Sequence, residues 1–226
     1  MKLNYFGHSC FSLEIAGHTV LFDPFITPNE QAGAIRLEEI KADYIFVSHG
    51  HADHIADCIT LAGQTGALVV AAFEVTEWLK GKGVEKVHPL NTGGKKSFPF
   101  GTVKCTVAHH SSGLPDGSYG GNPMGFLLTS DEGNVYYSGD TALTLDMQLV
   151  PRWAPVHWAI LPIGDNFTMG YDDAVEAARL VGCRKVIGVH YDTFGYIQID
   201  HDQAQKAFAD ASMELFLPAI GTGMEL

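Results

Sequence analysis

The heptapeptide SHGHADH, residues 48–54, concentrates side chains that bind metal ions. It directly follows an apolar run at 44–47 that is typical of a buried strand. Its potential ligands are His49, His51, Asp53 and His54. Neutral imidazole and carboxylate groups together suit zinc, iron or manganese, and a metal site with an open position lowers the pKa of bound water to near neutrality. The heptapeptide therefore predicts metal-dependent hydrolysis. A histidine-rich surface turn, the alternative, does not require this order of residues beside a strand.

The spacing within the heptapeptide indicates two metal ions. Side chains alternate along an extended segment, so His49 and His51 point to the same side of the chain. Asp53 and His54 lie where the chain turns into the next helix, and they can face a neighbouring point. We therefore expect two adjacent divalent ions. Zinc is the first choice and manganese or nickel the next, because the ligand types alone do not select one metal.

A pair of histidines follows a strand in the middle of the chain. Residues 103–107 alternate apolar and polar side chains, which predicts a strand, and they lead to His109 and His110. Neighbouring side chains on a strand point to opposite faces. Only one histidine of this pair is therefore expected to reach the metal ions, and the alternation does not say which.

Two more candidate ligands end strands in the second half. The strand predicted at 134–137 leads to Asp140, and the strand predicted at 185–189 leads to His190. A lone aspartate at a strand end is commonly a turn former or a helix cap. In a chain that already carries the histidine cluster, a carboxylate bridging the two ions is the favoured interpretation.

Four further polar residues occupy strand ends or loops. Residues 3–25 are predicted to form strand, turn, strand, with His8 at a strand end or bulge and Asp23 closing the second strand. An ordinary core or surface position explains His8 equally well, and a turn before proline explains Asp23. Asp165 and Asn166 lie in a polar loop after a later buried strand.

Length and charge limit the architecture and the partners. The chain has 226 residues, 46% of them hydrophobic, which is enough for a substantial core. No linker rich in Pro, Gly or Ser divides it, so we expect one domain over residues 1–226. The formal net charge of -12 argues against nucleic acid as the main partner, because such binding depends on Lys and Arg at phosphates.

The cysteines and the apolar runs indicate the compartment. None of the four cysteines, Cys10, Cys58, Cys105 and Cys183, forms a CxxC pair. Buried free thiols in a reducing compartment are the expected state, with a disulfide as the less favoured one. The sequence shows neither a signal peptide pattern nor an apolar run long enough for a membrane span. We therefore expect a cytoplasmic protein.

Predicted strands alternate with predicted helices in both halves of the chain, and in each half the strand ends deliver His or Asp. Two halves of this kind, each with helices on one side of a mixed sheet, would form an α/β fold with four layers, an αββα sandwich. The candidate ligands would then gather along one edge of the sandwich.

Motifs along essentially the whole chain resemble the metallo-β-lactamase superfamily. The resemblance rests on the order His49, His51, Asp53, His54, His110, Asp140 and His190. Shorter stretches are similar to a branch of metal-dependent hydrolases related to the L-ascorbate-6-phosphate lactonases. These stretches are GHS at 7–9, FDPF at 22–25, HSS at 110–112, SGDT at 138–141, PIGDNFTMG at 162–170 and VHY at 189–191.

The resemblance implies a role for each candidate residue. It places His49, His51 and His110 on one ion, Asp53, His54 and His190 on the other, and Asp140 between them. It also implies that His110, which precedes two serines, is a ligand and that His109 is not. His8 would be an extra ligand or a substrate contact, and Asp23 an outer partner of a metal-binding histidine. Asp165 and Asn166 would contact substrate.

The expected reaction is hydrolysis of an ester, lactone, amide or phosphoester by a hydroxide held between the ions. Asp53 is the expected catalytic residue, either orienting the hydroxide or protonating the leaving group. The expected partner is a small-molecule substrate, and no association with a membrane is expected. A homo-oligomer is compatible with the sequence. Two other functions stay open: a nucleic-acid-processing phosphodiesterase, and a non-catalytic metal-binding or redox protein.

Overall fold

The strands form two seven-stranded sheets in the computed structural model, which describes residues 1–226. The first sheet contains, in spatial order, β14 (Gly223–Glu225), β1 (Lys2–Gly7), β2 (Cys10–Ile15), β3 (His18–Phe22), β4 (Tyr44–Phe46), β5 (Leu68–Ala71) and β6 (Val87–Pro89). The second contains β13 (Glu214–Phe216), β12 (Lys185–Val189), β11 (Trp158–Pro162), β10 (Gly133–Tyr137), β9 (Met124–Ser130), β8 (Gly101–Val107) and β7 (Lys95–Phe98). Both sheets are mixed: β3 to β6 and β10 to β13 pair in parallel, and the remaining pairs are antiparallel.

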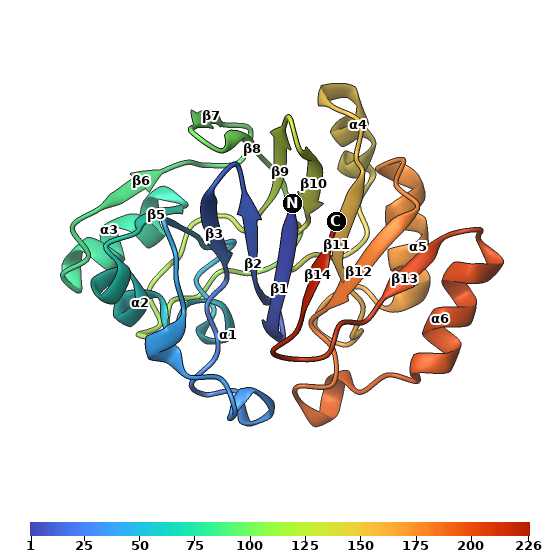
Figure 1. Cartoon of the computed structure of the whole chain (residues 1–226), viewed down its shortest axis with the longest axis horizontal. Coiled ribbons are helices and arrows are strands. Elements are labelled where there is room, and N and C mark those ends of the chain that lie inside the picture. The colour runs from blue at the N-terminus through green and yellow to red at the C-terminus, as the bar shows by residue number, and fades with distance from the viewer.

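Helices cover the outer faces of the two sheets (Figure 1). They are α1 (Ala52–Ile55), α2 (Cys58–Thr65), α3 (Phe73–Gly81), α4 (Val150–Trp153), α5 (Tyr171–Leu180) and α6 (His201–Asp210). Short 3-10 turns occur at Glu30–Ala32, Leu37–Glu39, Leu145–Leu149 and Gly195–Ile197. In Figure 1, α2 and α3 lie outside β5 and β6, whereas α5 and α6 lie outside β11 to β13. The predicted four-layer αββα sandwich is confirmed.

The main hydrophobic core lies between the two sheets. It joins buried side chains of both, as where the rings of Phe22 in β3 and Phe126 in β9 lie 5.9 Å apart. A second cluster packs the outer face of the second sheet against α5 and α6, with Ala178 and Phe208 fully buried. Apolar burial on both faces explains why the strands that carry the site residues read as continuous apolar runs.

The start of the chain differs from the prediction of strand, turn, strand. Two antiparallel strands, β1 and β2, occupy the place of the single first strand, and His8 and Ser9 form the turn between them. Gly7 takes a φ of 103°, which favours glycine, and this conformation lets the chain reverse. Strand-forming residues resume at Cys10, directly after the two turn residues, and for that reason the sequence pattern concealed the turn. His8 therefore lies at a hairpin tip.

The parallel strands direct their carboxyl ends to one edge of the sandwich, as expected. Phe46 of β4 is followed by the heptapeptide, and Tyr137 of β10 by the loop of Asp140. Val189 of β12 leads directly to His190. The β1–β2 turn reaches the same edge, because His190 donates its backbone N–H to the carbonyl of His8 at 3.0 Å.

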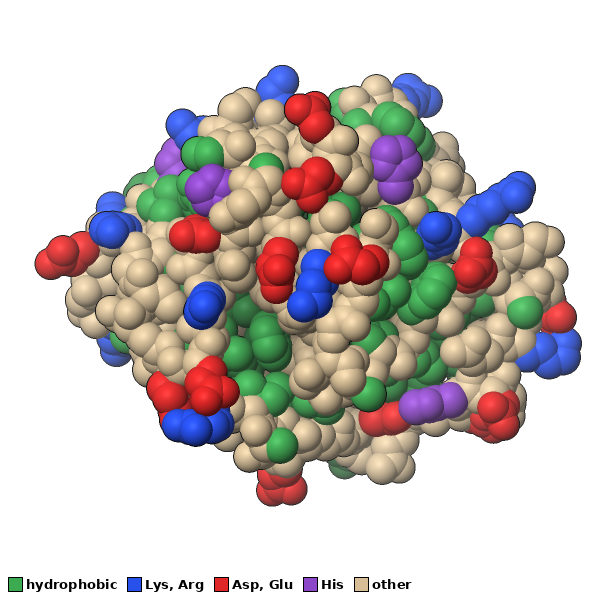
Figure 2. Space-filling model, viewed as in Figure 1, with side chains coloured by type: hydrophobic (Ala, Val, Ile, Leu, Met, Phe, Trp, Pro, Cys, Tyr) green, Lys and Arg blue, Asp and Glu red, His purple; other side chains and the backbone are tan.

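On the face in Figure 2, acidic and basic side chains are interspersed with apolar ones, and there is no continuous basic stripe. All four cysteines are buried free thiols, as predicted. Burial raises the pKa of Cys105 to about 12, so this thiol stays protonated at neutral pH. No helix combines the length and the apolar character that crossing a bilayer requires.

Candidate metal centre

The candidate ligands meet at the sheet edge in three overlapping groups. Within each group the potential ligand atoms all lie within 4.8 Å of one another. The first group is His49, His51 and His110; the second group is His8, Asp53, His54 and His190; the third is His49, His54 and Asp140. All seven residues proposed from the sequence as metal ligands are therefore brought together, and His8 joins them.

Asp140 lies between the first and second groups. Its Oδ2 atom is 3.7 Å from Nε2 of His110, on the side of the first group. The same oxygen is 3.2 Å from Nε2 of His54 and 3.0 Å from Nε2 of His190, on the side of the second group. One carboxylate thus faces both groups, which is the arrangement that a bridging ligand needs.

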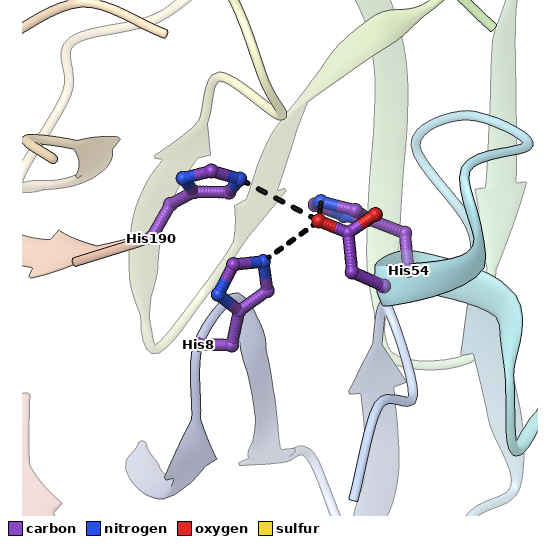
Figure 3. A group of neighbouring side chains, drawn as sticks. His8, His54 and His190 are labelled. Carbon is purple, nitrogen blue, oxygen red and sulfur yellow. Dashed lines mark hydrogen bonds and ion pairs between the residues drawn. The ribbon is translucent and has the colours of Figure 1, made fainter. Parts of the chain in front are cut away.

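The second group converges on one carboxylate oxygen (Figure 3). Oδ2 of Asp53 is 3.1 Å from Nε2 of His8, 3.7 Å from Nε2 of His190 and 3.9 Å from Nε2 of His54. Figure 3 shows the three labelled rings turned toward one another from the β1–β2 turn, from α1 and from the end of β12. Segments far apart in the sequence therefore supply one compact cluster.

Opposite charges determine the protonation states in the second group. Burial opposes a charge on His190, yet the Asp140 carboxylate raises the pKa of His190 to about 9. Burial likewise opposes a charge on His54, but Asp140 and Asp23 hold its pKa well above the usual value. Both carboxylates, Asp53 and Asp140, keep pKa values below their usual range despite burial, because of these imidazoles. A divalent cation would compete with the two imidazole protons for the same nitrogen atoms.

The other imidazoles are neutral, which is the form that binds metals. Burial and the neighbouring His54 hold the pKa of His49 well below its usual value. Burial lowers the pKa of His51 and of His110 as well. Burial, with the nearby His190, lowers the pKa of His8 to about 4. The first group therefore presents three neutral imidazole rings at neutral pH.

Serine hydroxyls orient the rings of the first group. Ser48 Oγ lies 2.9 Å from Nδ1 of His49, which leaves Nε2 of that ring to face Nδ1 of His51 at 2.9 Å. Ser111 Oγ lies 3.2 Å from Nε2 of His51. The rings of His49 and His51 thus each have one nitrogen on a hydroxyl and the other directed toward the neighbouring ring, as outer partners commonly arrange metal-binding histidines. Neither serine was predicted to act at the site, although Ser48 lies within the heptapeptide and Ser111 within the HSS motif.

Asp23 is a buried acceptor beneath the site. Its Oδ1 accepts the backbone N–H of Ser48 at 2.7 Å. Its Oδ2 lies 2.6 Å from Oγ of Ser48, 2.9 Å from Nδ1 of His54 and 2.5 Å from the Tyr137 hydroxyl. The carboxylate fixes the ring of His54 so that Nε2 points toward Asp140. Tyr137 was not identified from the sequence, although it lies just before the SGDT motif.

Asp23→Asn is expected to destabilise the protein by about 3 kcal/mol, since an amide cannot accept from all these buried donors. Urea unfolding of the metal-free protein measures the change. Tyr137→Phe is the matched control; it removes one donor and should cost about 1 kcal/mol. An unfolding free energy for Asp23→Asn within error of the parent's would mean that this carboxylate does not organise the site.

Backbone strain accumulates at the same place. His8, Asp23 and His190 adopt positive φ angles of 55°, 43° and 55°. Residues other than glycine rarely take this backbone conformation, and each instance costs about 1 kcal/mol or more. Three such residues within one cluster indicate that the fold tolerates strain in order to aim these side chains.

Two of the predicted site residues lie elsewhere, and one histidine points away. Asp165 and Asn166 line a separate open pocket together with Tyr171 and Asp200, and no member of the three groups lines it. Their predicted contact with substrate stays a prediction. His109 is exposed, and its Nε2 lies 3.6 Å from Oδ2 of Asp146, outside the groups.

The donor atoms fit divalent cations. Nε2 of His54 and Oδ1 of Asp140 are buried and have no hydrogen-bond partner within the protein. Buried polar atoms without partners are costly, and an ion is one of the standard explanations for them. The set combines imidazole nitrogen with carboxylate oxygen, as zinc, manganese and nickel sites do.

Comparisons with known proteins agree with this chemistry. A family model described as the β-lactamase superfamily domain matches residues 18–191. A UPF0173 metal-dependent hydrolase of Flavobacterium johnsoniae is 47% identical over 226 residues, 100% of both chains. One from Methylacidiphilum infernorum is 50% identical over 93% of both chains. The solved structure of Igni18, a metallo hydrolase of Ignicoccus hospitalis, has a TM-score of 0.87 at 30% identity and covers 100% of this chain and 98% of its own. The chain therefore belongs to the metallo-β-lactamase superfamily and is one of its metal-dependent hydrolases.

Proposed function

We propose that the protein hydrolyses an ester, lactone or phosphoester bond of a small molecule at a site for two divalent ions. The observation that carries the proposal is the position of Asp140, whose Oδ2 lies 3.0 Å from His190 and 3.7 Å from His110. A single group of ligands would need no shared carboxylate. Membership in the family supports metal-dependent hydrolysis, and the two groups on either side of Asp140 support two ions.

In this proposal the first group, His49, His51 and His110, holds one ion. Asp53, His54 and His190 of the second group hold the other, and Asp140 contributes to both. Zinc is the first candidate, followed by manganese and nickel. Divalent ions bound there would supply Lewis acidity and a shared water of lowered pKa.

Asp53 acts as an ionised carboxylate in this scheme. Despite burial, the nearby imidazole of His54 and its neighbours lower the pKa of Asp53 below its usual range. Such a group accepts and orients hydrogen bonds, and it is a poor proton donor to a leaving group at neutral pH. Of the two roles considered for Asp53, orientation of the nucleophilic water is therefore favoured. His8, at 3.1 Å, holds Asp53 from the other side.

Removal of divalent ions is expected to abolish hydrolysis, and their return to restore it. The purified protein is stripped with a chelator and reloaded separately with zinc, manganese or nickel. Each form is then assayed against carboxylic esters, lactones, thioesters and phosphodiesters, and its metal content is measured by mass spectrometry. Two ions per chain together with turnover of one bond class is the expected result, and the most active metal identifies the preferred ion.

The stripped protein is the matched control, because it shares every contaminant of the preparation. Retention of full activity after complete loss of metal would contradict the proposal. Tight binding of two ions without hydrolysis of any bond class would favour the alternative of a non-catalytic metal-binding protein. We also propose a cytoplasmic location, which fits four buried thiols that form no disulfide.

A further inference from the structure

The loops that carry the metal ligands contain no Lys or Arg. Residues 3–35, 42–79, 105–151, 153–178 and 186–205 contain no Lys or Arg. The loops that follow β4, β8, β11 and β12 lie within these ranges, whereas the loop after β3 also contains Arg36 and Lys41. Of the basic residues that border these ranges, Arg36 pairs with Glu38 and Glu39, and Lys206 pairs with Asp210.

This absence limits the charge of a substrate. Proteins recognise phosphate and carboxylate groups mainly through Arg and Lys, often with two hydrogen bonds. A charged group at a distance from the reacting bond would find no such partner here. It would instead meet carboxylates such as Asp165 and Asp192, on the loops that leave β11 and β12. An anionic group on the substrate would therefore be repelled.

The same loops expose large aromatic side chains. Phe194 is 38% exposed, and its ring centroid lies 5.3 Å from the ring of His8 in the second group. The buried Phe25 supports this arrangement, at 5.4 Å from His8 and 6.3 Å from Phe194. Phe167 and Tyr196 are 51% and 78% exposed, with ring centroids 6.1 Å apart. We name Phe167, Phe194 and Tyr196 the aromatic rim.

The two loops of the aromatic rim are held tightly together. A Cβ atom on Gly164 would lie only 2.1 Å from the carbonyl oxygen of His190, so glycine is needed for this close approach. Oδ2 of Asp192 lies 2.6 Å from Nε2 of His201, and Oδ1 of Asp192 accepts the backbone N–H of Ile199 at 3.0 Å. These two contacts stabilise the loop after β12. The rim is thus a formed surface that begins beside the ligands at Phe194 and reaches the separate pocket of Asp165 at Tyr196. Clustered exposed aromatic residues commonly mark binding sites.

We propose that the substrate is an uncharged ester or lactone whose apolar part packs on the aromatic rim. The inference rests on the proposed hydrolysis and specifies its substrate class. Aromatic faces bind apolar groups with little loss of side-chain entropy. The lack of Lys and Arg on the ligand-bearing loops argues against a further phosphate or carboxylate group at a distance from the reacting bond. The reacting bond lies toward His8 and Asp53, and the apolar part extends over Phe194 toward Tyr196.

Two matched esters test the substrate charge. Phenyl butyrate is neutral, whereas para-carboxyphenyl butyrate differs by one carboxylate on the leaving group. We expect the metal-loaded protein to hydrolyse the neutral ester with a kcat/KM about tenfold or more above that of the charged one, after subtraction of the uncatalysed rates. Equal or greater kcat/KM for the charged ester would overturn the inference.

Two rim substitutions test the contact. Phe194→Ala and Tyr196→Ala are expected to raise KM for phenyl butyrate about tenfold, with kcat within about twofold and the metal content unchanged. Trp153→Ala is the matched control, because Trp153 is 45% exposed but packs on Lys104 of β8 and contacts neither the rim nor the ligands. Phe194→Arg should shift the preference toward the charged ester. Unchanged KM values in both alanine variants would overturn the inference.

A probe without a scissile bond separates this inference from the proposed reaction. Benzyl propyl ketone has the shape of phenyl butyrate, and its binding can be measured by calorimetry on the metal-loaded protein. Binding that weakens about tenfold in Phe194→Ala supports the rim contact, even if no ester is hydrolysed, in which case the hydrolytic proposal fails alone. Hydrolysis of esters with identical ketone binding in parent and Phe194→Ala would overturn the rim contact and leave hydrolysis intact.

Discussion

Asp140→Asn is expected to release metal from both groups and to remove nearly all hydrolytic activity. The amide has the shape of the carboxylate but no charge, and its nitrogen cannot bind a cation. Oδ2 of Asp140 lies within 3.7 Å of imidazole nitrogens in both groups. Loss of an outer partner of a metal ligand costs about 10-fold to 100-fold. Removing a carboxylate that both ions share should lower kcat/KM by more than the removal of an outer partner does, so we expect a fall of roughly 1,000-fold.

Metal content by mass spectrometry after dialysis gives the direct measurement, with circular dichroism to confirm folding. Asp146→Asn is a suitable control because Asp146 follows Asp140 in the chain but is exposed, contacts His109 and belongs to none of the three groups. It should keep two ions per chain and full activity. Two tightly held ions in Asp140→Asn would show that Asp140 does not bridge. Loss of only one ion would assign this carboxylate to a single group.

The fold class followed from local patterns because the strands are buried on both faces. Ile45 and Phe46 in β4, and Ile160 and Leu161 in β11, are almost fully buried, so the sequence there is continuously apolar and marks a strand plainly. The three-residue strands β13 and β14 gave no such signal. They are short edge strands with exposed residues, and their pairing depends on neighbours that are distant in the sequence.

The gathering of the site residues could be predicted for a similar reason. Parallel strands send their carboxyl ends to one edge, so His or Asp residues that follow several apolar runs have to converge. His190 and Asp140 follow this rule. His8 does not, because it lies at the turn of an antiparallel hairpin. Contacts with segments distant in the sequence, among them that of its carbonyl with the backbone of His190, bring it into the second group.

Residues that act through hydrogen bonds were harder to identify. Tyr137 reads as a buried strand residue, and nothing in the local sequence shows that its hydroxyl meets Asp23 at 2.5 Å across the two sheets. Thr193 is comparable: its Oγ1 lies 3.0 Å from Nδ1 of His8, although 185 positions separate the two residues. Such pairs depend on the packing of one sheet on the other, which the periodicity of a single strand does not determine.

The adjacent histidines His109 and His110 should respond to substitution in opposite ways. His110→Ala removes a ring of the first group that is 13% exposed and faces Asp140. It is expected to lose one of the two ions and to lower kcat/KM at least about 100-fold. His109→Ala removes a ring that is 60% exposed and contacts Asp146. It should retain both ions and an activity within about twofold of the parent's.

This pair is a well-matched comparison, since the two positions share a loop, a residue type and a substitution. Metal stoichiometry and ester hydrolysis are measured on both variants in parallel, and excess zinc is then added to each. Excess metal should partly restore His110→Ala if the remaining ligands still form a weaker site. Equal loss of metal from both variants would mean that the loop, and not the imidazole of His110, holds the ion. Loss of metal from His109→Ala alone would show that His109, and not His110, is the ligand. The sequence predicted from strand alternation that only one of the two rings would face the centre. In the structure both histidines lie in the loop after β8, and His110 is the one that joins the first group.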